Sequence, residues 1–255
     1  MEEPLPVPES PPEAPPPAMS LAARLLNVFA IPGEVFEVVK ASRASVGNWL
    51  LPMLLAMVVG MVSAISILSQ PAIQGQMHEQ QAKLLARQVQ AGKMTRAQAD
   101  QTVALVQKFT VPLTVIATVM VSVIRVLWWA FVLWLLGRLF LKARLRYGQM
   151  LEVAGLGTMI SVLGTIVLLL LTVKLAHGSA TPGLPLVISD LDATRKSHVV
   201  AGAVTVFSFW QVAVLSVGLG RFAGAPFLRA AWLVFACWVL QECFFSLLGF
   251  GQMAF

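Results

Sequence analysis

The sequence predicts an all-α, polytopic membrane helix bundle with five transmembrane helices and a helical hairpin outside the bilayer. Two observations lead to this fold class. First, only 12% of the 255 residues are charged, about half the share in a typical soluble domain, and 58% are apolar. Second, the apolar residues gather in long runs, and the mean hydropathy of the chain is +0.80. This composition excludes a typical soluble enzyme, a disordered regulator and a disulfide-stapled secreted domain.

The N-terminal region has two parts of different composition. Residues 1–18 hold eight of the fifteen prolines and four glutamates, so we expect a disordered tail. Residues 19–47 contain two short helical patterns, the first beginning after Ser20 and ending at Pro32. Both are amphipathic and too short to span, and we expect helices that lie in the membrane interface. The alternative is a docking face for a protein partner.

Residues 48–255 form the predicted membrane domain. Five apolar runs in it reach the roughly 20 residues that a helix needs to cross a bilayer. The predicted spans lie at about residues 49–68, 111–137, 151–173, 199–220 and 230–250. In the first span, Ala56, Gly60 and Ala64 recur at every fourth position and predict a small-residue face for close helix packing.

A polar segment, residues 72–108, separates the first two spans. Gln, Lys and Arg dominate its composition, and its apolar residues recur at helical spacing. Gly92 marks a helix stop, and Thr95 with Gln98 forms a T-x-x-Q capping box that begins a second helix. The segment therefore predicts a helical hairpin outside the bilayer.

Two ionisable residues lie deep inside predicted spans, Arg125 in the second and Glu242 in the fifth. Charged residues inside a membrane almost always face the protein interior and are often paired. We therefore expect an intramembrane ion pair between Arg125 and Glu242, with Gln211 or Gln241 as hydrogen-bonding neighbours. The pair acts as a clip between helices in one interpretation and as a proton or ion relay in the other.

Basic residues set the expected orientation. With the N-terminus in the cytoplasm, nine basic residues lie on the cytoplasmic side and eight on the other. Short loops that are rich in basic residues have the strongest influence on orientation, and the loop with the highest density of basic residues follows the second span. It predicts a cytoplasmic N-terminus and an external C-terminus. We expect this loop to face anionic lipids or a partner through Arg138, Lys142, Arg144 and Arg146.

The sequence shows no pattern for catalysis, metal binding or cofactor binding. Cys237 and Cys243 lie six residues apart in an apolar run, on faces of a helix about 120° apart. No nucleophile–base motif is present, and the three histidines are scattered through polar segments. We therefore expect no enzyme and no cofactor. The net charge is +6, but the basic residues form no stripe interleaved with stacking aromatic residues, so we expect no nucleic acid partner.

Several loose, mostly apolar motifs occur in a fixed order. Residues 24–36 are RLLNVFAIPGEVF, followed by LGR at 136–138, YGQML at 147–151 and FSFWQ at 207–211. In order and spacing, over residues 21–250, they resemble the Yip (Ypt-interacting protein) domain family of five-span membrane proteins, bacterial branch. The resemblance implies a cytoplasmic N-terminus and a bacterial inner (plasma) membrane. Eukaryotic relatives take part in membrane trafficking and associate with Rab-type GTPases.

These expectations combine into one function. The protein is expected to be a non-enzymatic scaffold, or a membrane-organising or trafficking-type factor, acting through helix packing and cytoplasmic-face contacts. Its expected partners are the lipid bilayer, anionic lipids and a protein at the cytoplasmic face. The alternative is a small transporter or permease with a polar mid-membrane site near Arg125, Glu242 and Gln211.

Overall fold

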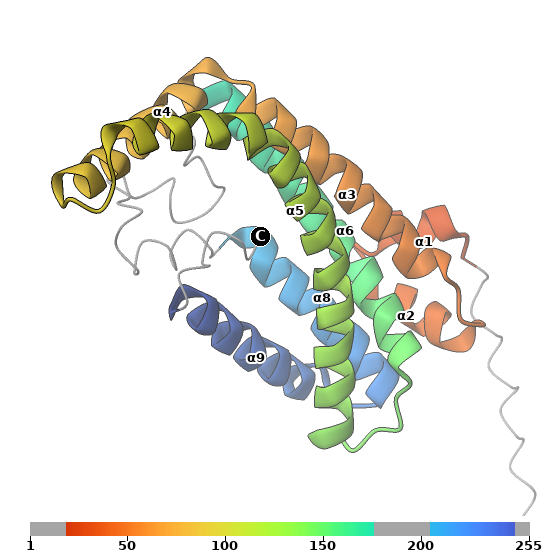
Figure 1. Ribbon diagram of the computed structural model, residues 1–255. Helices are drawn as coiled ribbons and strands as arrows, with labels where there is room; N and C mark the ends of the chain where they lie inside the picture. The colour runs from red at the N-terminus through yellow and green to blue at the C-terminus, as the bar shows by residue number, and fades with distance from the viewer. Residues whose placement is uncertain (1–18, 176–204, 248–255) are drawn as a thin grey trace, which may run out of the picture.

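The computed structural model describes residues 19–175 and 205–247, and every regular element in these two ranges is a helix (Figure 1). The predicted all-α class is confirmed. The helices are α1 (Leu21–Asn27), α2 (Pro32–Ala41), α3 (Gly47–Leu68), α4 (Pro71–Gln90), α5 (Arg96–Leu139), α6 (Tyr147–Leu175), α8 (Val206–Ala223) and α9 (Phe227–Leu247).

Five of the helices, α3, α5, α6, α8 and α9, are long and apolar enough to cross a membrane. The predicted number of spans, five, is confirmed. The expected tail at residues 1–18, the polar stretch at 176–198 and the ends of two predicted spans, 199–204 and 248–250, lie outside the described residues.

The second span and the second arm of the hairpin are one helix of 44 residues, α5. The Thr95 hydroxyl accepts from the Gln98 backbone N–H, and the Gln98 side chain accepts from the Thr95 N–H, so the predicted capping box is present. Figure 1 shows α4 and the beginning of α5 at one end of the bundle, with α2 beside α8 at the other. In the hairpin, the Lys83 ammonium holds the pKa of Glu79 below its usual range.

The two short N-terminal helices occur where the sequence places them. Ser20 caps α1 by accepting from the Ala23 N–H, and Pro32 occupies the first position of α2, where its missing N–H costs nothing. The apolar side of α2 packs on α8, and Val35 and Phe36 are fully buried there. Other parts of the same chain therefore cover this apolar side.

Helix α8 lies at the centre of the bundle, in contact with α2, α5, α6 and α9. In the most apolar 18-residue stretch of α8, 56% of the residues are buried inside the protein. The corresponding share is 17% for α3 and 22% for α9. Exposed apolar residues line the outer faces of the peripheral helices, among them Val58, Ile116 and Leu240. These faces are the surface that lipid would contact.

Candidate functional site

The chain crosses the bundle in alternating directions, so the ends of α5 and α8 meet the beginnings of α3, α6 and α9. We call this the basic end of the bundle. Its basic residues come from six separate segments, and all but Arg24 are exposed. They are Arg24, Lys40, Arg43, Arg138, Lys142, Arg144, Arg146, Arg221 and Arg229.

The last turn of α5 and the loop that follows it present the four predicted basic residues on a defined backbone. Arg138 lies over the Trp134 ring, with the guanidinium carbon 5.1 Å from the ring centroid. Lys142 has a φ of 53°, a left-handed conformation that reverses the chain. Leu145 is buried against Gly137 of α5, and this contact fixes the loop to the bundle. Arg138, Lys142, Arg144 and Arg146 are all exposed.

Two further contacts fix this loop to its neighbours. The Arg229 guanidinium, in the first turn of α9, donates to the Phe140 carbonyl at 3.2 Å. The Tyr147 hydroxyl, at the beginning of α6, donates to the Leu127 carbonyl of α5 at 3.1 Å. The loop is therefore held by three spanning helices.

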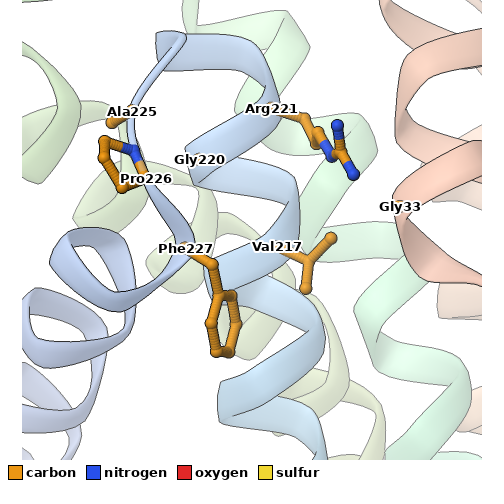
Figure 2. Close-up of a pocket in the computed structure, with 7 residues that line it drawn as sticks. All are labelled: Gly33, Val217, Gly220, Arg221, Ala225, Pro226 and Phe227. Carbon is orange, nitrogen blue, oxygen red and sulfur yellow. The ribbon is translucent and has the colours of Figure 1, made fainter.

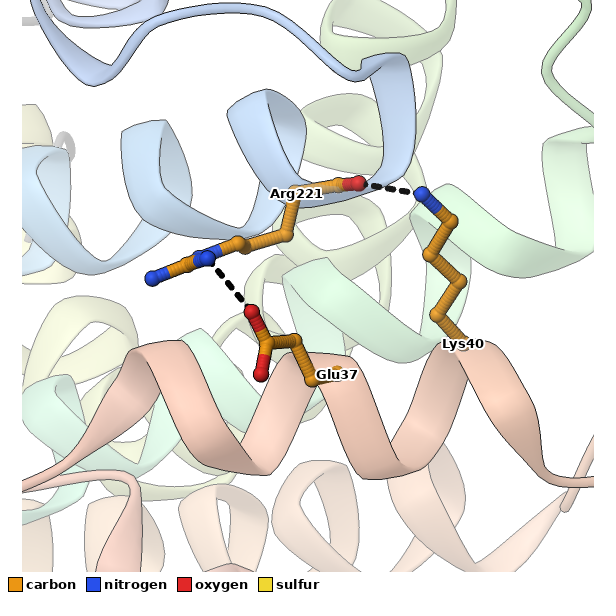
Figure 3. A network of polar contacts seen from close by, with 3 residues as sticks. All are labelled: Glu37, Lys40 and Arg221. Carbon is orange, nitrogen blue, oxygen red and sulfur yellow. Dashed lines mark hydrogen bonds and ion pairs between the residues drawn. The ribbon is translucent and has the colours of Figure 1, made fainter. Parts of the chain in front are cut away.

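A second polar cluster joins α2 to the last turn of α8, as Figure 3 shows. The Arg221 guanidinium forms an ion pair with the Glu37 carboxylate. The Lys40 ammonium donates to the Arg221 backbone carbonyl at 2.7 Å. That carbonyl belongs to the last turn of α8, which lacks helical partners for its C=O groups, so Lys40 also caps the helix. We call these three residues the α2–α8 clamp.

A pocket of about 490 Å³ lies next to the clamp, between α2, α8 and the turn into α9 (Figure 2). Its one charged lining residue is Arg221, and the remaining lining is apolar side chain or bare glycine. The lining residues are Gly33, Val217, Gly220, Arg221, Ala225, Pro226 and Phe227.

Deep in the bundle, Arg125 of α5 connects to α6 and α8. One guanidinium nitrogen, Nη2, donates to Ser161 Oγ at 2.8 Å and to Gln211 Oε1 at 3.0 Å. The Ser161 hydroxyl also donates to Gln211 Oε1 at 2.8 Å, which closes a three-residue network. Of the two predicted hydrogen-bonding neighbours, Gln211 contacts Arg125, whereas Gln241 accepts from the Trp128 indole at 2.6 Å.

Glu242 of α9 lies at a depth similar to that of Arg125. The two residues stand 15 and 14 positions from the basic end of their helices, which at 1.5 Å per residue is about 21 Å. Glu242 is buried, with about 6% of its surface exposed. The ion pairs between described residues are Lys83–Glu79 and Arg221–Glu37. A direct Arg125–Glu242 ion pair stays a prediction.

Comparison with protein families matches the chain to the Yip1 domain over residues 26–249. The chain belongs to the Yip1 domain family. No curated protein and no solved structure matches it. The Yip1 domain covers all five candidate spans, the basic loop, the α2–α8 clamp and the Arg125 network. The predicted resemblance is confirmed.

Sequence reasoning missed one buried acid of this Yip1 domain, Glu152 in the first turns of α6. Its carboxylate accepts from the Ser45 backbone N–H at 2.5 Å, just before α3. Asn48 lies beside it, fully buried, and accepts from the Arg24 guanidinium of α1 at 3.3 Å. These residues tie α1, α3 and α6 together. The signal that the sequence offered was a lone Glu in an otherwise apolar run.

The Yip1 domain shows no metal-binding cluster of His, Cys, Asp and Glu side chains among the described residues. Cys237 and Cys243 are both free thiols. The Yip1 family is not known for an enzymatic activity.

Proposed function

We propose that this Yip1-domain protein is a non-enzymatic membrane-organising factor that concentrates anionic lipids, and through them partner proteins, at its basic end. One observation carries the proposal, the exposed basic loop Arg138–Arg146 held on three spanning helices. A basic residue close to an anionic leaflet contributes about 1 kcal/mol, so four such residues contribute about 4 kcal/mol. Because salt screens this attraction, it weakens as ionic strength rises.

The proposal includes an orientation and a compartment. The basic end faces the cytoplasm, which places the N-terminus inside and the C-terminus outside a bacterial plasma membrane. The support for this is the density of basic residues between α5 and α6 and the positive-inside tendency of short loops.

The Arg125 network supports a scaffold. Its hydrogen bonds join α5, α6 and α8 side by side, which is the arrangement of a packing contact between helices. In this proposal Arg125 positions the spans that carry the basic end, and no group is transferred at it.

The proposal is tested by measuring which lipids surround the protein in vesicles. Brominated phosphatidylglycerol quenches tryptophan fluorescence on contact, and Trp49, Trp134 and Trp232 all lie within two turns of the basic end. We expect wild-type protein to be quenched more by brominated phosphatidylglycerol than by brominated phosphatidylcholine at equal mole fraction. The triple variant Lys142→Gln, Arg144→Gln, Arg146→Gln should lose most of this excess, and so should wild-type protein in 1 M salt.

The matched control removes three charges from the hairpin at the opposite end, with Lys83→Gln, Arg87→Gln and Lys93→Gln. These residues lie on α4 and the turn after it, away from the basic end, so the excess quenching should remain. If the loop variant behaves like wild type, or if both triple variants lose the excess equally, the basic loop is not the lipid-recruiting surface.

A further inference from the structure

We propose that the pocket beside the α2–α8 clamp binds one anionic phospholipid, with the Arg221 guanidinium as the ligand of the headgroup phosphate. This goes beyond the proposed role of the basic loop. The loop attracts any anionic surface, whereas the pocket would hold a single lipid molecule at a defined place. Three features favour such a site: the shape of the pocket, the free donors of Arg221 and the local charge.

The shape of the pocket leaves room beside the guanidinium. Gly33 and Gly220 contribute no side chain to the lining, and Figure 2 shows Arg221 extending from α8 toward Gly33. A Cβ atom at Gly33 would stand 3.2 Å from Arg221 Nη2, so any larger residue there would crowd this group. The absence of a side chain at Gly33 leaves this side of the guanidinium uncovered.

Arg221 has donors to spare. A guanidinium carries five N–H groups, and the Arg221 ion pair with Glu37 uses Nη1. Among the described residues, no hydrogen-bond acceptor contacts Nη2 or Nε, and the side chain is about half exposed. The free edge with these two nitrogens has the fork geometry that matches two phosphate oxygens.

The charge around the pocket favours an anion. On α2, just after it and in the last turn of α8, three positive charges come from Lys40, Arg43 and Arg221, and two negative charges come from Glu34 and Glu37. The net charge of +1 would attract a phosphodiester and repel the choline group of a zwitterionic lipid. Glu37 competes with a phosphate for Arg221, so the site holds an internal competitor.

The apolar part of the pocket points to a lipid rather than a soluble phosphate. Val217 and Phe227 form its apolar walls, and Phe227 is half exposed at the beginning of α9. Leu228 and Trp232, both 66% exposed, lie on the outer face of α9 beyond the pocket. A lipid with its phosphate on Arg221 would therefore lay its acyl chains over the outer face of α9.

The test measures lipids retained on purified protein in a neutral detergent by native mass spectrometry. The probes are dioleoylphosphatidylglycerol, dioleoylphosphatidylcholine and inorganic phosphate. We expect one phosphatidylglycerol to bind the wild type, with affinity at least tenfold above that for phosphatidylcholine and without competition from millimolar phosphate. Arg221→Gln should weaken binding at least tenfold, because charge-assisted hydrogen bonds to the phosphate are lost. Ala225→Leu should also weaken it by filling the pocket.

Two further variants separate a phosphate ligand from a structural clamp. Glu37→Gln breaks the same ion pair as Arg221→Gln but frees the guanidinium, so it should bind phosphatidylglycerol as tightly as wild type or more tightly. Arg43→Gln removes an exposed charge that adds to the local field but does not bind the phosphate, so it should weaken binding much less than Arg221→Gln does. Thermal unfolding of each variant checks that it is folded.

The proposal is overturned by any of four results. These are equal loss in Glu37→Gln and Arg221→Gln, equal loss in Arg43→Gln and Arg221→Gln, unchanged binding in Ala225→Leu, and displacement of the lipid by inorganic phosphate. The basic-loop variant Lys142→Gln, Arg144→Gln, Arg146→Gln should keep the bound lipid in detergent. Failure of the loop proposal in vesicles and failure of the pocket proposal in detergent are therefore distinguishable.

Discussion

Arg125 places a guanidinium about 21 Å from the basic end of α5, where an unpaired charge would be costly. Ser161 and Gln211 reduce that cost by offering oxygen acceptors from two neighbouring helices. The bonds also specify which faces of α5, α6 and α8 meet, because an alternative rotation of any helix would leave the charge without these partners. The residue thus contributes to the uniqueness of the packing as well as to its stability.

Replacing Gln211, which accepts a hydrogen bond from Arg125, should destabilise the protein more than replacing Gln241. We expect Gln211→Leu to lower the free energy of unfolding by about 1–3 kcal/mol, because Arg125 loses an acceptor while it remains inside the bundle. The measurement is thermal unfolding in detergent. Gln241→Leu is the matched control, since Gln241 bonds the exposed Trp128 indole instead. Equal effects of the two variants would contradict the assignment.

Glu242 allows a direct test of the predicted ion pair. If Arg125 and Glu242 stabilise each other, the single variants Arg125→Gln and Glu242→Gln should cost more in sum than the double variant does. We expect a coupling of at least about 0.5 kcal/mol in this double-mutant cycle. Strictly additive effects would remove the pair from consideration, leaving the Ser161–Gln211 network as the partner of Arg125.

At this scale the sequence predicts which residues are unusual but not which residues they contact. Arg125 and Glu242 stand out because a charge interrupts an apolar run. The contact of Arg125 with Ser161 depends on helix rotation, which composition does not determine. The ion pair of Glu37 and Arg221 joins residues 184 positions apart, and each residue alone has the pattern of an ordinary solvated charge.

Glycines let particular pairs of helices approach each other. A Cβ atom at Gly155 of α6 would lie 2.3 Å from the Trp49 Cα and 2.8 Å from the Asn48 carbonyl oxygen, so the backbones of α6 and α3 meet there. Gly60, in the small-residue face predicted for the first span, would place a Cβ 2.7 Å from the Thr118 methyl group of α5. The predicted close packing at Gly60 is thus present, with α5 as its partner.

The approach at Gly155 gives a prediction for the α3–α6 pair. We expect Gly155→Val to destabilise the protein by roughly 1–3 kcal/mol or more, since a side chain there would have to displace backbone atoms. Tryptophan fluorescence during thermal unfolding would report the change, as Trp49 lies at the contact. Gly148→Val on the same helix faces open space and should have little effect. A stable Gly155→Val variant would contradict the close approach.

Helix positions follow from the sequence more closely than helix boundaries do. Caps at Ser20 and Thr95 mark the beginnings of α1 and α5 because their hydroxyls satisfy local N–H groups, and both effects act over a few residues. The sequence does not predict that α5 continues through residue 110, because the composition changes from polar to apolar there and Pro112, a residue type that usually ends a helix, follows at once. Thr110 and Thr114 donate within the helix to carbonyls four residues earlier.

Over the whole molecule, the antiparallel arrangement collects basic residues that are scattered along the chain. Contacts such as Arg229 with Phe140 and Lys40 with Arg221 bring three distant segments to one end: α2, the loop after α5, and the segment around the turn between α8 and α9. The sequence count of nine basic residues against eight scarcely distinguishes the two sides. The two sides differ in how far their basic residues lie from the ends of the spans. In the hairpin the basic residues are spread along α4, whereas at the basic end they lie close to the ends of the spanning helices.

Cysteine labelling tests the orientation that follows. In a Cys237→Ser, Cys243→Ser background, single cysteines replace the exposed Ala41 at the basic end and the exposed Ala91 in the hairpin turn. We expect a membrane-impermeant maleimide to label Ala91→Cys in intact spheroplasts and Ala41→Cys only after lysis, because a basic end near the bilayer is retained on the cytoplasmic side. Labelling of Ala41→Cys from outside, with Ala91→Cys protected, would invert the orientation and remove the basic loop from the cytoplasmic leaflet.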